Sequence, residues 1–171
     1  GYGVFDNCVN KGKITFNNSN GTKYRRTGGI VGCVGSDAGL GYTLRMTNSR
    51  NEADIAASTA SVGGLIGIAE KVASPALIEN CINTGNMTSP TMADYDLFYM
   101  GGIAGKVAGA FTLKNCTNRG NLTAAVERDI AGIAVSGDDN AVFDGCENYG
   151  NITAVANHKT DKWRPIVAGI V

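Results

Sequence analysis

A nine-residue motif occurs five times in this chain, and its regular recurrence limits the possible folds more than any other feature. Its consensus is N-C-x-N-x-G-x-(I/L/M)-T, and the copies span residues 7–15, 48–56, 80–88, 115–123 and 145–153. A second shared segment, G-G-I-V-G or a close variant, follows each copy and begins at positions 28, 63, 101, 131 and 168. The cysteine slot falls at positions 8, 49, 81, 116 and 146, so the period is 30 to 41 residues. Such a period is typical of a solenoid or another repeat array.

Residue alternation indicates that the repeat unit is made of β-strands. The apolar segments are short, β-branched and interrupted by Gly and Asn, and none shows helical spacing over ten or more positions. Within each motif the cysteine, the asparagine two residues later, the glycine four later and the aliphatic residue six later share one parity. We assign that parity to the interior. The column after the aliphatic residue is predicted to face solvent and reads Thr15, Ala56, Thr88, Thr123 and Thr153.

The sequence therefore predicts an all-β chain folded as a right-handed parallel β-helix, or β-solenoid, of about five coils. We expect residues 1–171 to form one β-solenoid repeat domain, with repeats at about 3–40, 41–75, 76–110, 111–140 and 141–171. Its narrow core is predicted to hold Ile, Leu, Val, Phe, Ala and stacked Cys. Both ends of the chain interrupt a repeat, so we expect a fragment of a longer repeat protein or end-to-end packing with further repeats.

Two features of the motif predict where each coil bends. An apolar column lies three residues before the cysteine slot, which breaks the alternation, so a bend or bulge is expected between them. That column reads Phe5, Met46, Ile78, Leu113 and Phe143. We also expect a sharp corner in the left-handed conformation at the second asparagine of the motif and at the glycine two residues after it. The glycine slot reads Gly12, Ala53, Gly85, Gly120 and Gly150.

The second asparagine and the cysteine of the motif are predicted to be structural. Equivalent residues on successive coils lie about 4.8 Å apart, so identical asparagines can form a hydrogen-bonded ladder that satisfies their buried amides. The predicted ladder consists of Asn10, Asn51, Asn83, Asn118 and Asn148. The cysteine slot holds Cys8, Cys81, Cys116 and Cys146, with Ser49 in the second copy. A slot that accepts serine indicates a small packed side chain, and we expect mostly free thiols because side chains that point the same way fit disulfide geometry poorly.

Composition excludes several classes of function. The formal net charge is zero, with 15 acidic and 15 basic residues, which removes the electrostatic argument for nucleic acid or an anionic membrane. No apolar run approaches the roughly 18 residues of a membrane-spanning helix. No C-x-x-C pair, EF-hand loop or G-K-(S/T) phosphate loop is present, so we predict no metal and no cofactor. The chain opens without a Met or a signal peptide, as a mature or trimmed fragment would.

Inserts that interrupt the repeat carry the best candidates for ligand or partner contact. They lie between the aliphatic slot and the G-G segment in the first, third and fifth copies, and they hold three of the six Tyr and the single Trp. Inserts at one repeat position emerge on one side of a solenoid. Aromatic faces stack on sugars or pack against protein partners, so a host or bacterial surface glycan or protein is the expected partner. The predicted contact residues are Tyr24, Arg25, Arg26, Tyr95, Tyr99, Trp163 and Arg164.

Catalytic residues are not predicted. The adjacent carboxylates of the inserts come from single coils and are typical of solvated turns. They are Asp94 with Asp96 and Asp138 with Asp139, and the basic Lys159 and Arg164 also lie in an insert. The one histidine, His158, has no partner at ligand spacing. A column between the apolar and cysteine slots is interpreted as a solvated face with weak neighbouring pairs and reads Asp6, Thr47, Glu79, Lys114 and Asp144.

The motif N-C-x-N-x-G-x-I followed by G-G-I-V-G resembles the GLUG-type repeats of large bacterial surface and secreted proteins. The resemblance covers essentially the whole chain, although Ala131 and Ala168 replace the first Gly of the last two G-G segments. It implies an extracellular or cell-surface β-solenoid that acts as an adhesin-like or structural spacer segment, without shared catalytic residues. The alternative from the residues themselves is a carbohydrate-binding or polysaccharide-degrading β-helix protein.

Overall fold

The structure, a computed structural model, describes residues 2–17, 25–35, 43–58, 60–70, 76–89, 98–124, 129–136, 140–155 and 166–171. Within these residues all regular structure is β, and the strands follow one another in five coils. The first two coils contain β1 (Tyr2–Asp6), β2 (Val9–Asn10), β3 (Ile14–Phe16), β4 (Arg26–Gly28), β5 (Val31–Val34), β6 (Thr43–Thr47), β7 (Arg50–Asn51), β8 (Ile55–Ala57), β9 (Ser61–Gly63) and β10 (Ile66–Ala69). The third contains β11 (Ala76–Glu79), β12 (Ile82–Asn83), β13 (Met87–Ser89), β14 (Tyr99–Gly101) and β15 (Ala104–Val107). The last two contain β16 (Phe111–Lys114), β17 (Thr117–Asn118), β18 (Leu122–Ala124), β19 (Asp129–Ala131), β20 (Ala134–Ser136), β21 (Ala141–Asp144), β22 (Glu147–Asn148), β23 (Ile152–Ala154) and β24 (Val167–Ala168).

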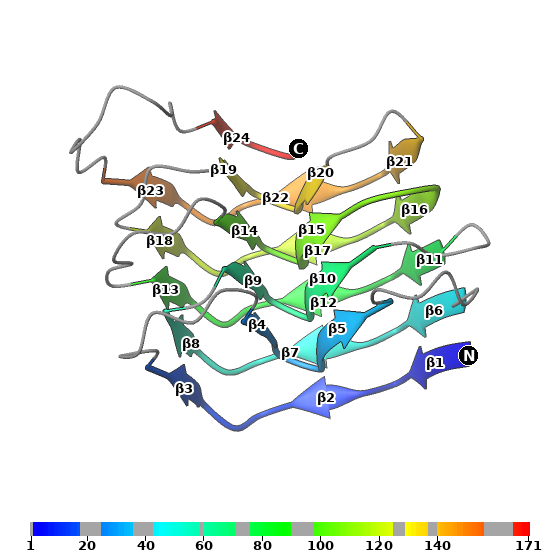
Figure 1. Cartoon of the computed structure of the whole chain (residues 1–171), viewed down its shortest axis with the longest axis horizontal. Helices are drawn as coiled ribbons and strands as arrows, with labels where there is room; N and C mark the ends of the chain where they lie inside the picture. Colours follow the sequence, from blue (N-terminus) through cyan, green and yellow to red (C-terminus); the bar gives the residue numbers. More distant parts are fainter. Residues whose placement is uncertain are drawn as a thin grey trace.

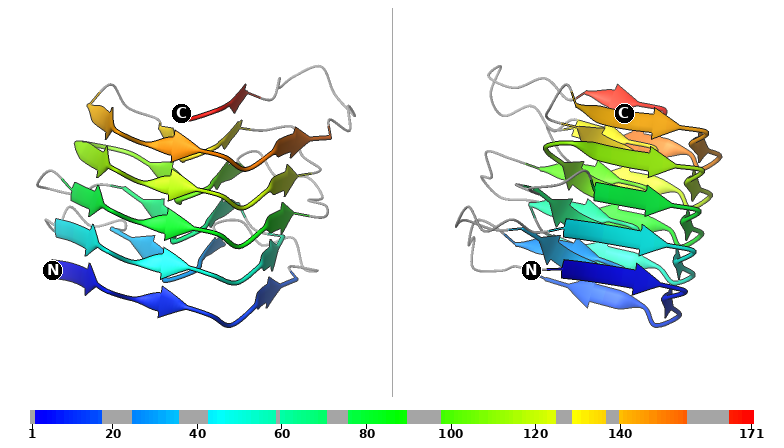
Figure 2. Two further views of the ribbon diagram at one scale, coloured as in Figure 1. Left: turned by 180° about the vertical axis from the view of Figure 1, so that it is seen from behind. Right: turned by 90° about the vertical axis from the view of Figure 1, so that its right-hand side faces the viewer.

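Strands at the same position of successive coils pair in parallel and form five sheets (Figure 1). We name them in chain order: sheet A (β1-β6-β11-β16-β21), sheet B (β2-β7-β12-β17-β22), sheet C (β3-β8-β13-β18-β23), sheet D (β4-β9-β14-β19-β24) and sheet E (β5-β10-β15-β20). The chain runs along sheets A, B and C on one side, returns along D and E on the other, and climbs one coil per turn (Figures 1 and 2). This winding is right-handed and confirms the predicted parallel β-helix of about five coils.

The pairing register matches the columns expected from the repeat. Sheet A stacks the apolar column in order, with Phe5 beside Met46 and Ile78 beside Leu113. Sheet C stacks Thr88 beside Thr123, and the threonines of this column are exposed, as predicted. Because the side-chain period of a strand is two, this register puts every aliphatic slot of sheet C inside.

The left-handed residue of each coil lies at the corner between sheets A and B. In the first four coils it is the first asparagine of the motif, and in the fifth it is Gly145, with φ between 51° and 59°. The predicted bend between the apolar column and the cysteine slot is therefore confirmed. The expectation of a left-handed corner at the second asparagine and at the following glycine is wrong, because no residue of those two slots has positive φ. The residues with this conformation are Asn7, Asn48, Asn80, Asn115 and Gly145.

Close approach between coils explains the later glycine of the motif. A Cβ built on Gly120 would lie 1.9 Å from the carbonyl oxygen of Gly85 on the preceding coil. The second asparagine instead lies in the short strands of sheet B with its side chain inside, where Asn51, Asn83 and Asn118 are fully buried. Glycine is therefore favoured in its slot mainly by space, and asparagine in its slot by an internal hydrogen-bond network.

A polar seam divides the interior into two apolar parts. In the first four G-G segments the second glycine faces the ladder asparagine of the following coil: a Cβ on Gly102 would lie 2.4 Å from Cγ of Asn118. On one side of this seam, residues of sheets A and E pack with the buried cysteines; on the other, residues of sheets C and D pack together. The predicted core is present on both sides, and Met46, Met87 and Met100 are buried in it as well.

Candidate binding surfaces

The predicted asparagine ladder is continuous through all five coils. Each Nδ2 donates to the Oδ1 of the next asparagine along the stack, at 2.7 to 2.8 Å from Asn10 to Asn148. In the last four coils each Nδ2 also donates to the backbone carbonyl two residues later, at 2.8 to 3.0 Å. The buried amides are satisfied by one another and by their own turns, so the ladder stabilises the stack and is not a ligand site.

The cysteine column is also structural. Cys8, Cys81, Cys116 and Cys146 are free thiols, as predicted for this slot, and the thiol of Cys116 donates to the carbonyl of Ile78 at 3.4 Å. Hydrogen bonding to Cys146 and Cys81, followed by burial, raises the pKa of Cys116. The hydrogen bond from Cys116 lowers the pKa of the less buried Cys146 to about 7. The fifth cysteine, Cys33, lies outside this column and is exposed.

Thiol alkylation should begin at the exposed cysteine and reach the buried cysteines last. We expect iodoacetamide at neutral pH to modify Cys33 first and to leave Cys81 and Cys116 unmodified until the protein unfolds, because only thiolate that meets the reagent reacts. Peptide mass spectrometry after timed quenching measures each site, and the same reaction in denaturant is the control. Early modification of Cys116 would contradict the packed column.

The predicted contact residues that the structure describes gather at sheet D. Arg26 and Tyr99 lie partly exposed in one column of that sheet, while Thr27 and Met100 are buried in the next column. Ser61, which pairs between them, is buried, and its hydroxyl donates to the carbonyl of Gly67. Asp129 belongs to the same column and pairs beside Tyr99. Arg25 is exposed and directly precedes β4.

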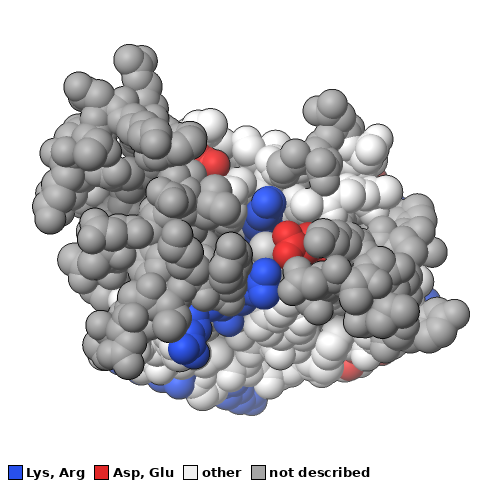
Figure 3. Space-filling view, viewed as in Figure 1, with Lys and Arg blue, Asp and Glu red and all other residues white. Residues whose placement is uncertain are grey.

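Sheet E contributes charges to the same face. Nη2 of Arg26 lies 3.3 Å from Oε1 of Glu70, which follows β10, and both side chains are about one-fifth exposed. Nζ of Lys106 on β15 lies 4.9 Å from the ring centroid of Tyr99. We name the surface formed by Arg26, Tyr99, Asp129, Glu70 and Lys106 the D–E face. Figure 3 shows Lys and Arg side chains gathered along the middle of this side of the molecule, with acidic side chains beside them.

Four predicted contact residues lie outside the described residues. They are Tyr24, Tyr95, Trp163 and Arg164. The carboxylates Asp94, Asp96, Asp138 and Asp139, with His158 and Lys159, also lie outside them. The structure therefore brings together Arg26 and Tyr99, places Arg25 at the start of the same sheet, and supplies Glu70 and Lys106, which the sequence did not single out.

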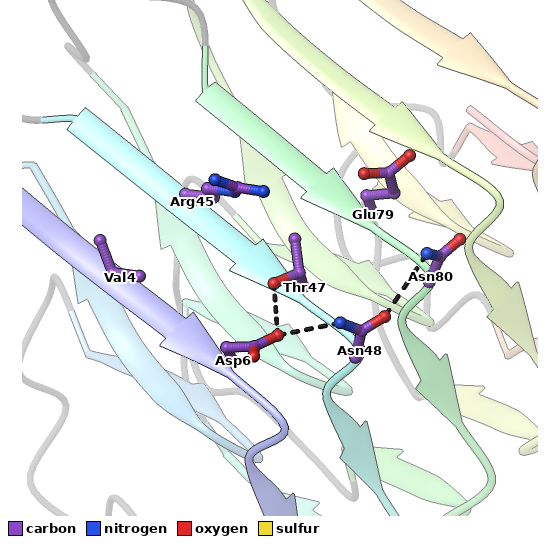
Figure 4. Close-up of a pocket in the computed structure, with 7 residues that line it drawn as sticks. All are labelled: Val4, Asp6, Arg45, Thr47, Asn48, Glu79 and Asn80. Carbon is purple, nitrogen blue, oxygen red and sulfur yellow. Dashed lines mark hydrogen bonds between the residues drawn. The ribbon is translucent and has the colours of Figure 1, made fainter.

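A second surface is a polar concavity of about 350 Å³ on the outside of sheet A (Figure 4). Oδ1 of Asp6 accepts from the hydroxyl of Thr47 at 2.6 Å and from Nδ2 of Asn48 at 2.9 Å. The left-handed asparagines continue this network, since Asn80 Nδ2 lies 3.4 Å from Asn48 Oδ1. Farther along the same column, Lys114 Nζ lies 3.9 Å from Glu79 Oε1, one of the weak neighbouring pairs expected there. The lining residues are Val4, Asp6, Arg45, Thr47, Asn48, Glu79 and Asn80.

Stability should depend on pH through Asp6. The hydrogen bond from Thr47, followed by the one from Asn48, lowers the pKa of Asp6 in the folded state. A depressed folded pKa stabilises the protein above the unfolded pKa of about 3.9, and this contribution is lost as pH falls through the folded value. We expect Asp6→Asn to melt below wild type at pH 7 and the gap to close in acid. Melting temperatures measured from about pH 2 to 7, which covers the titration of a carboxylate, give this difference between variant and wild type. Asp144→Asn is the control. A difference that does not change with pH would contradict the role assigned to Asp6.

One exposed aromatic site was missed from the sequence. Tyr149 lies within the repeat itself, directly after β22, and is 63% exposed on the outer face of sheet B. The guanidinium of Arg119 lies 5.2 Å from the centroid of the Tyr149 ring, and the Tyr149 hydroxyl donates to Glu147. The signal was present, because Tyr149 occupies the outward slot that holds Lys11, Glu52, Thr84 and Arg119 in the other copies.

Metal-ligating groups do not converge in the part of the chain that the structure describes. No group of three or more His, Cys, Asp or Glu side chains there could hold a metal ion. Among the same residues, no helix is long and apolar enough to cross a membrane.

The fold defines this chain as a parallel β-helix repeat protein. No protein-family model matches the sequence, and no curated protein or solved structure matches it either.

Proposed function

We propose that this chain is a non-catalytic repeat segment of a bacterial cell-surface or secreted protein, in which it acts as a spacer or adhesin-like module. The observation that carries the proposal is a frame of constant dimensions. The connections from sheet A to B always contain two residues, those from B to C three, and those from D to E two, as in Asp6 to Val9, Asn10 to Ile14 and Gly28 to Val31.

Variation in length is confined to two positions of each coil. The connections from sheet C to D range from the short one between Ala57 and Ser61 to the long one between Ala154 and Val167. Those from sheet E to A also vary, from Val107–Phe111 to Val34–Thr43. A frame held constant while two edges vary is the design expected of a scaffold that projects or displays segments.

The continuous stack supports a mechanical role. Five sheets and the asparagine ladder connect every coil to the next, so each coil adds about 4.8 Å of length. Resemblance of the repeat to GLUG-type repeats supports a location outside the cell.

A glycan-binding module is the second candidate. The D–E face supports it, because Tyr99 and Lys106 place an aromatic ring beside a cation and Arg26 lies in the same column. Such groups stack on and hydrogen-bond to sugars.

Surface location tests the first proposal. Intact bacteria that produce the protein from its native gene should lose it after brief treatment with an external protease, while a cytosolic marker survives. Protection of the protein until the cells are lysed would reject a surface location, and recovery from the medium before treatment would indicate secretion.

Titration against polysaccharides tests the second candidate. If the D–E face binds a glycan, Tyr99→Ala should weaken binding by roughly 10-fold, as removal of a contact hot spot does, whereas Arg50→Ala on sheet B should not. Calorimetry measures the affinity, and release of reducing ends with and without calcium measures turnover. Turnover would contradict the non-catalytic assignment, and equal effects of the two substitutions would contradict the D–E face.

A further inference from the structure

The polar concavity on the outer face of sheet A arises where one coil breaks the pattern of a charged column. The column reads Asp6, Thr47, Glu79, Lys114 and Asp144, so only the second coil lacks a charged side chain there. Thr47 pairs between Asp6 and Glu79. Its short side chain is only 7% exposed and forms the floor of the concavity, with the two carboxylates on either side (Figure 4).

Two asparagines of the left-handed corner line the concavity with amide groups. Asn48 and Asn80 have φ of 52° and 54°, and both side chains are exposed. Asn48 Nδ2 donates to Asp6 Oδ1 at 2.9 Å, and Asn80 Nδ2 lies 3.4 Å from Asn48 Oδ1. Each amide has a second N–H and a second lone pair on its oxygen, so this side of the concavity offers both donors and acceptors.

The charges around the concavity balance one another. Asp6 and Glu79 contribute two carboxylates, the exposed Arg45 contributes a guanidinium, and Nζ of Lys114 lies 3.9 Å from Oε1 of Glu79. A cationic ligand would meet the guanidinium, and an anionic ligand would meet a carboxylate on each side of Thr47. The ligand that fits this set is therefore neutral and carries groups that both donate and accept hydrogen bonds.

We propose that the concavity binds one neutral sugar unit of a glycan. Hydroxyl groups donate to carboxylates and accept from guanidinium and amide N–H groups, so they match every polar group that lines it. The backbones of Asp6 and Glu79 lie two coil spacings, about 10 Å, apart, which is close to one sugar ring with a hydrogen bond at each end. Val4, which is 69% exposed, supplies an apolar contact for the C–H face of the ring.

This site is separate from the D–E face and does not rest on either function proposed above. Sheet A lies on the other side of the coil from sheet D (Figure 2). The concavity opens on the face of the sheet, and coils stack along its edges, so a longer stack leaves the site open.

Titration of the full chain with small glycosides, followed by nuclear magnetic resonance, tests the proposal. The neutral probes are the methyl glycosides of glucose, galactose, mannose and N-acetylglucosamine, and the charged probes are glucuronic acid and glucosamine. We expect a neutral probe to shift the side-chain amide signals of Asn48 and Asn80 with a Kd of about 1 mM. Absence of a saturable shift with every neutral probe up to about 20 mM, or tighter binding of a charged probe at these amides, would overturn the proposal. Shifts confined to the surroundings of Tyr99 would place sugar binding at the D–E face instead, and would also overturn it.

Two arginine variants locate the site. Arg45→Ala should weaken binding of the same probe roughly 10-fold, whereas Arg50→Ala on sheet B, which is also exposed, should leave it unchanged. Thr47→Gln, which fills the concavity, should abolish the shifts, and unchanged dispersion of the backbone signals shows that the variant is folded. Equal effects of the two arginine substitutions, or full binding by a folded Thr47→Gln variant, would show that the sugar does not bind in the concavity.

Discussion

Replacing Asn83 by alanine is expected to lower the free energy of unfolding by about 3 to 5 kcal/mol. Nδ2 of Asn83 donates to Gly85 O at 3.0 Å and to Asn118 Oδ1 at 2.8 Å, and its Oδ1 accepts from Asn51 at 2.8 Å. Alanine removes all three bonds at a fully buried position. Most of the expected loss arises because the former partners of Asn83 stay buried without a hydrogen bond and cannot reach water.

A matched substitution at the end of the ladder separates burial from the loss of an amide. Asn10 makes one ladder bond, to Asn51 at 2.7 Å, and is only half-buried. We expect Asn10→Ala to lower the free energy of unfolding by about 1 kcal/mol, since water can replace the lost partner. Urea denaturation followed by circular dichroism measures both variants. Asn83→Asp should be at least as damaging as alanine because it keeps the shape and loses both donors. Equal losses at Asn83 and Asn10 would show that the buried ladder is not a main source of stability.

Replacing Gly102 by alanine is expected to lower the free energy of unfolding by about 3 kcal/mol or more. The new Cβ would lie 2.1 Å from the carbonyl oxygen of Gly132 and 2.4 Å from Cγ of Asn118. The first contact is backbone of the next coil and the second is a ladder residue that is itself fully buried. Neither can move without breaking interactions between coils.

Gly169 is the matched control for Gly102. It occupies the same slot in the fifth coil, where an added Cβ meets no atom within 4 Å. Neither glycine has positive φ, so the comparison measures packing alone. We expect Gly169→Ala to change the free energy of unfolding by less than about 0.5 kcal/mol. A mild effect at Gly102 would mean that the coils can separate locally without loss of stability. If the clash with Asn118 is part of the loss, Asn118→Ala combined with Gly102→Ala should cost less than the sum of the two.

Much of the architecture follows from the repeat alone. Equivalent positions of a parallel stack must lie beside one another, so the columns of Asn83, Cys116 and Thr123 could be placed before any coordinates were known. Parity then decided which columns are buried. The candidate contact residues were predicted less completely: Arg26 and Tyr99 do share a column of sheet D, but Tyr149 was passed over because it lies within the repeat.

The left-handed corner shows why the remainder was harder to predict. Both asparagines of the motif can adopt positive φ, so residue type alone did not distinguish Asn80 from Asn83. One substitution contained the answer, because Gly145 replaces the first asparagine, whereas the second is never replaced. Glycine is the residue that a left-handed position accepts most readily.

The sequence by itself determined the period, the number of coils, the parallel stacking and the inward columns, because these depend on repetition and on the two-residue alternation of strands. Only the tertiary structure decided that the N-x-G and G-G parts of the repeat touch across the coil. That contact depends on how far two sheets stand apart, which no local pattern encodes. The second asparagine of the nine-residue motif and the second glycine of the G-G segment therefore form one contact. The ladder asparagine fits there because the residue opposite it has no side chain.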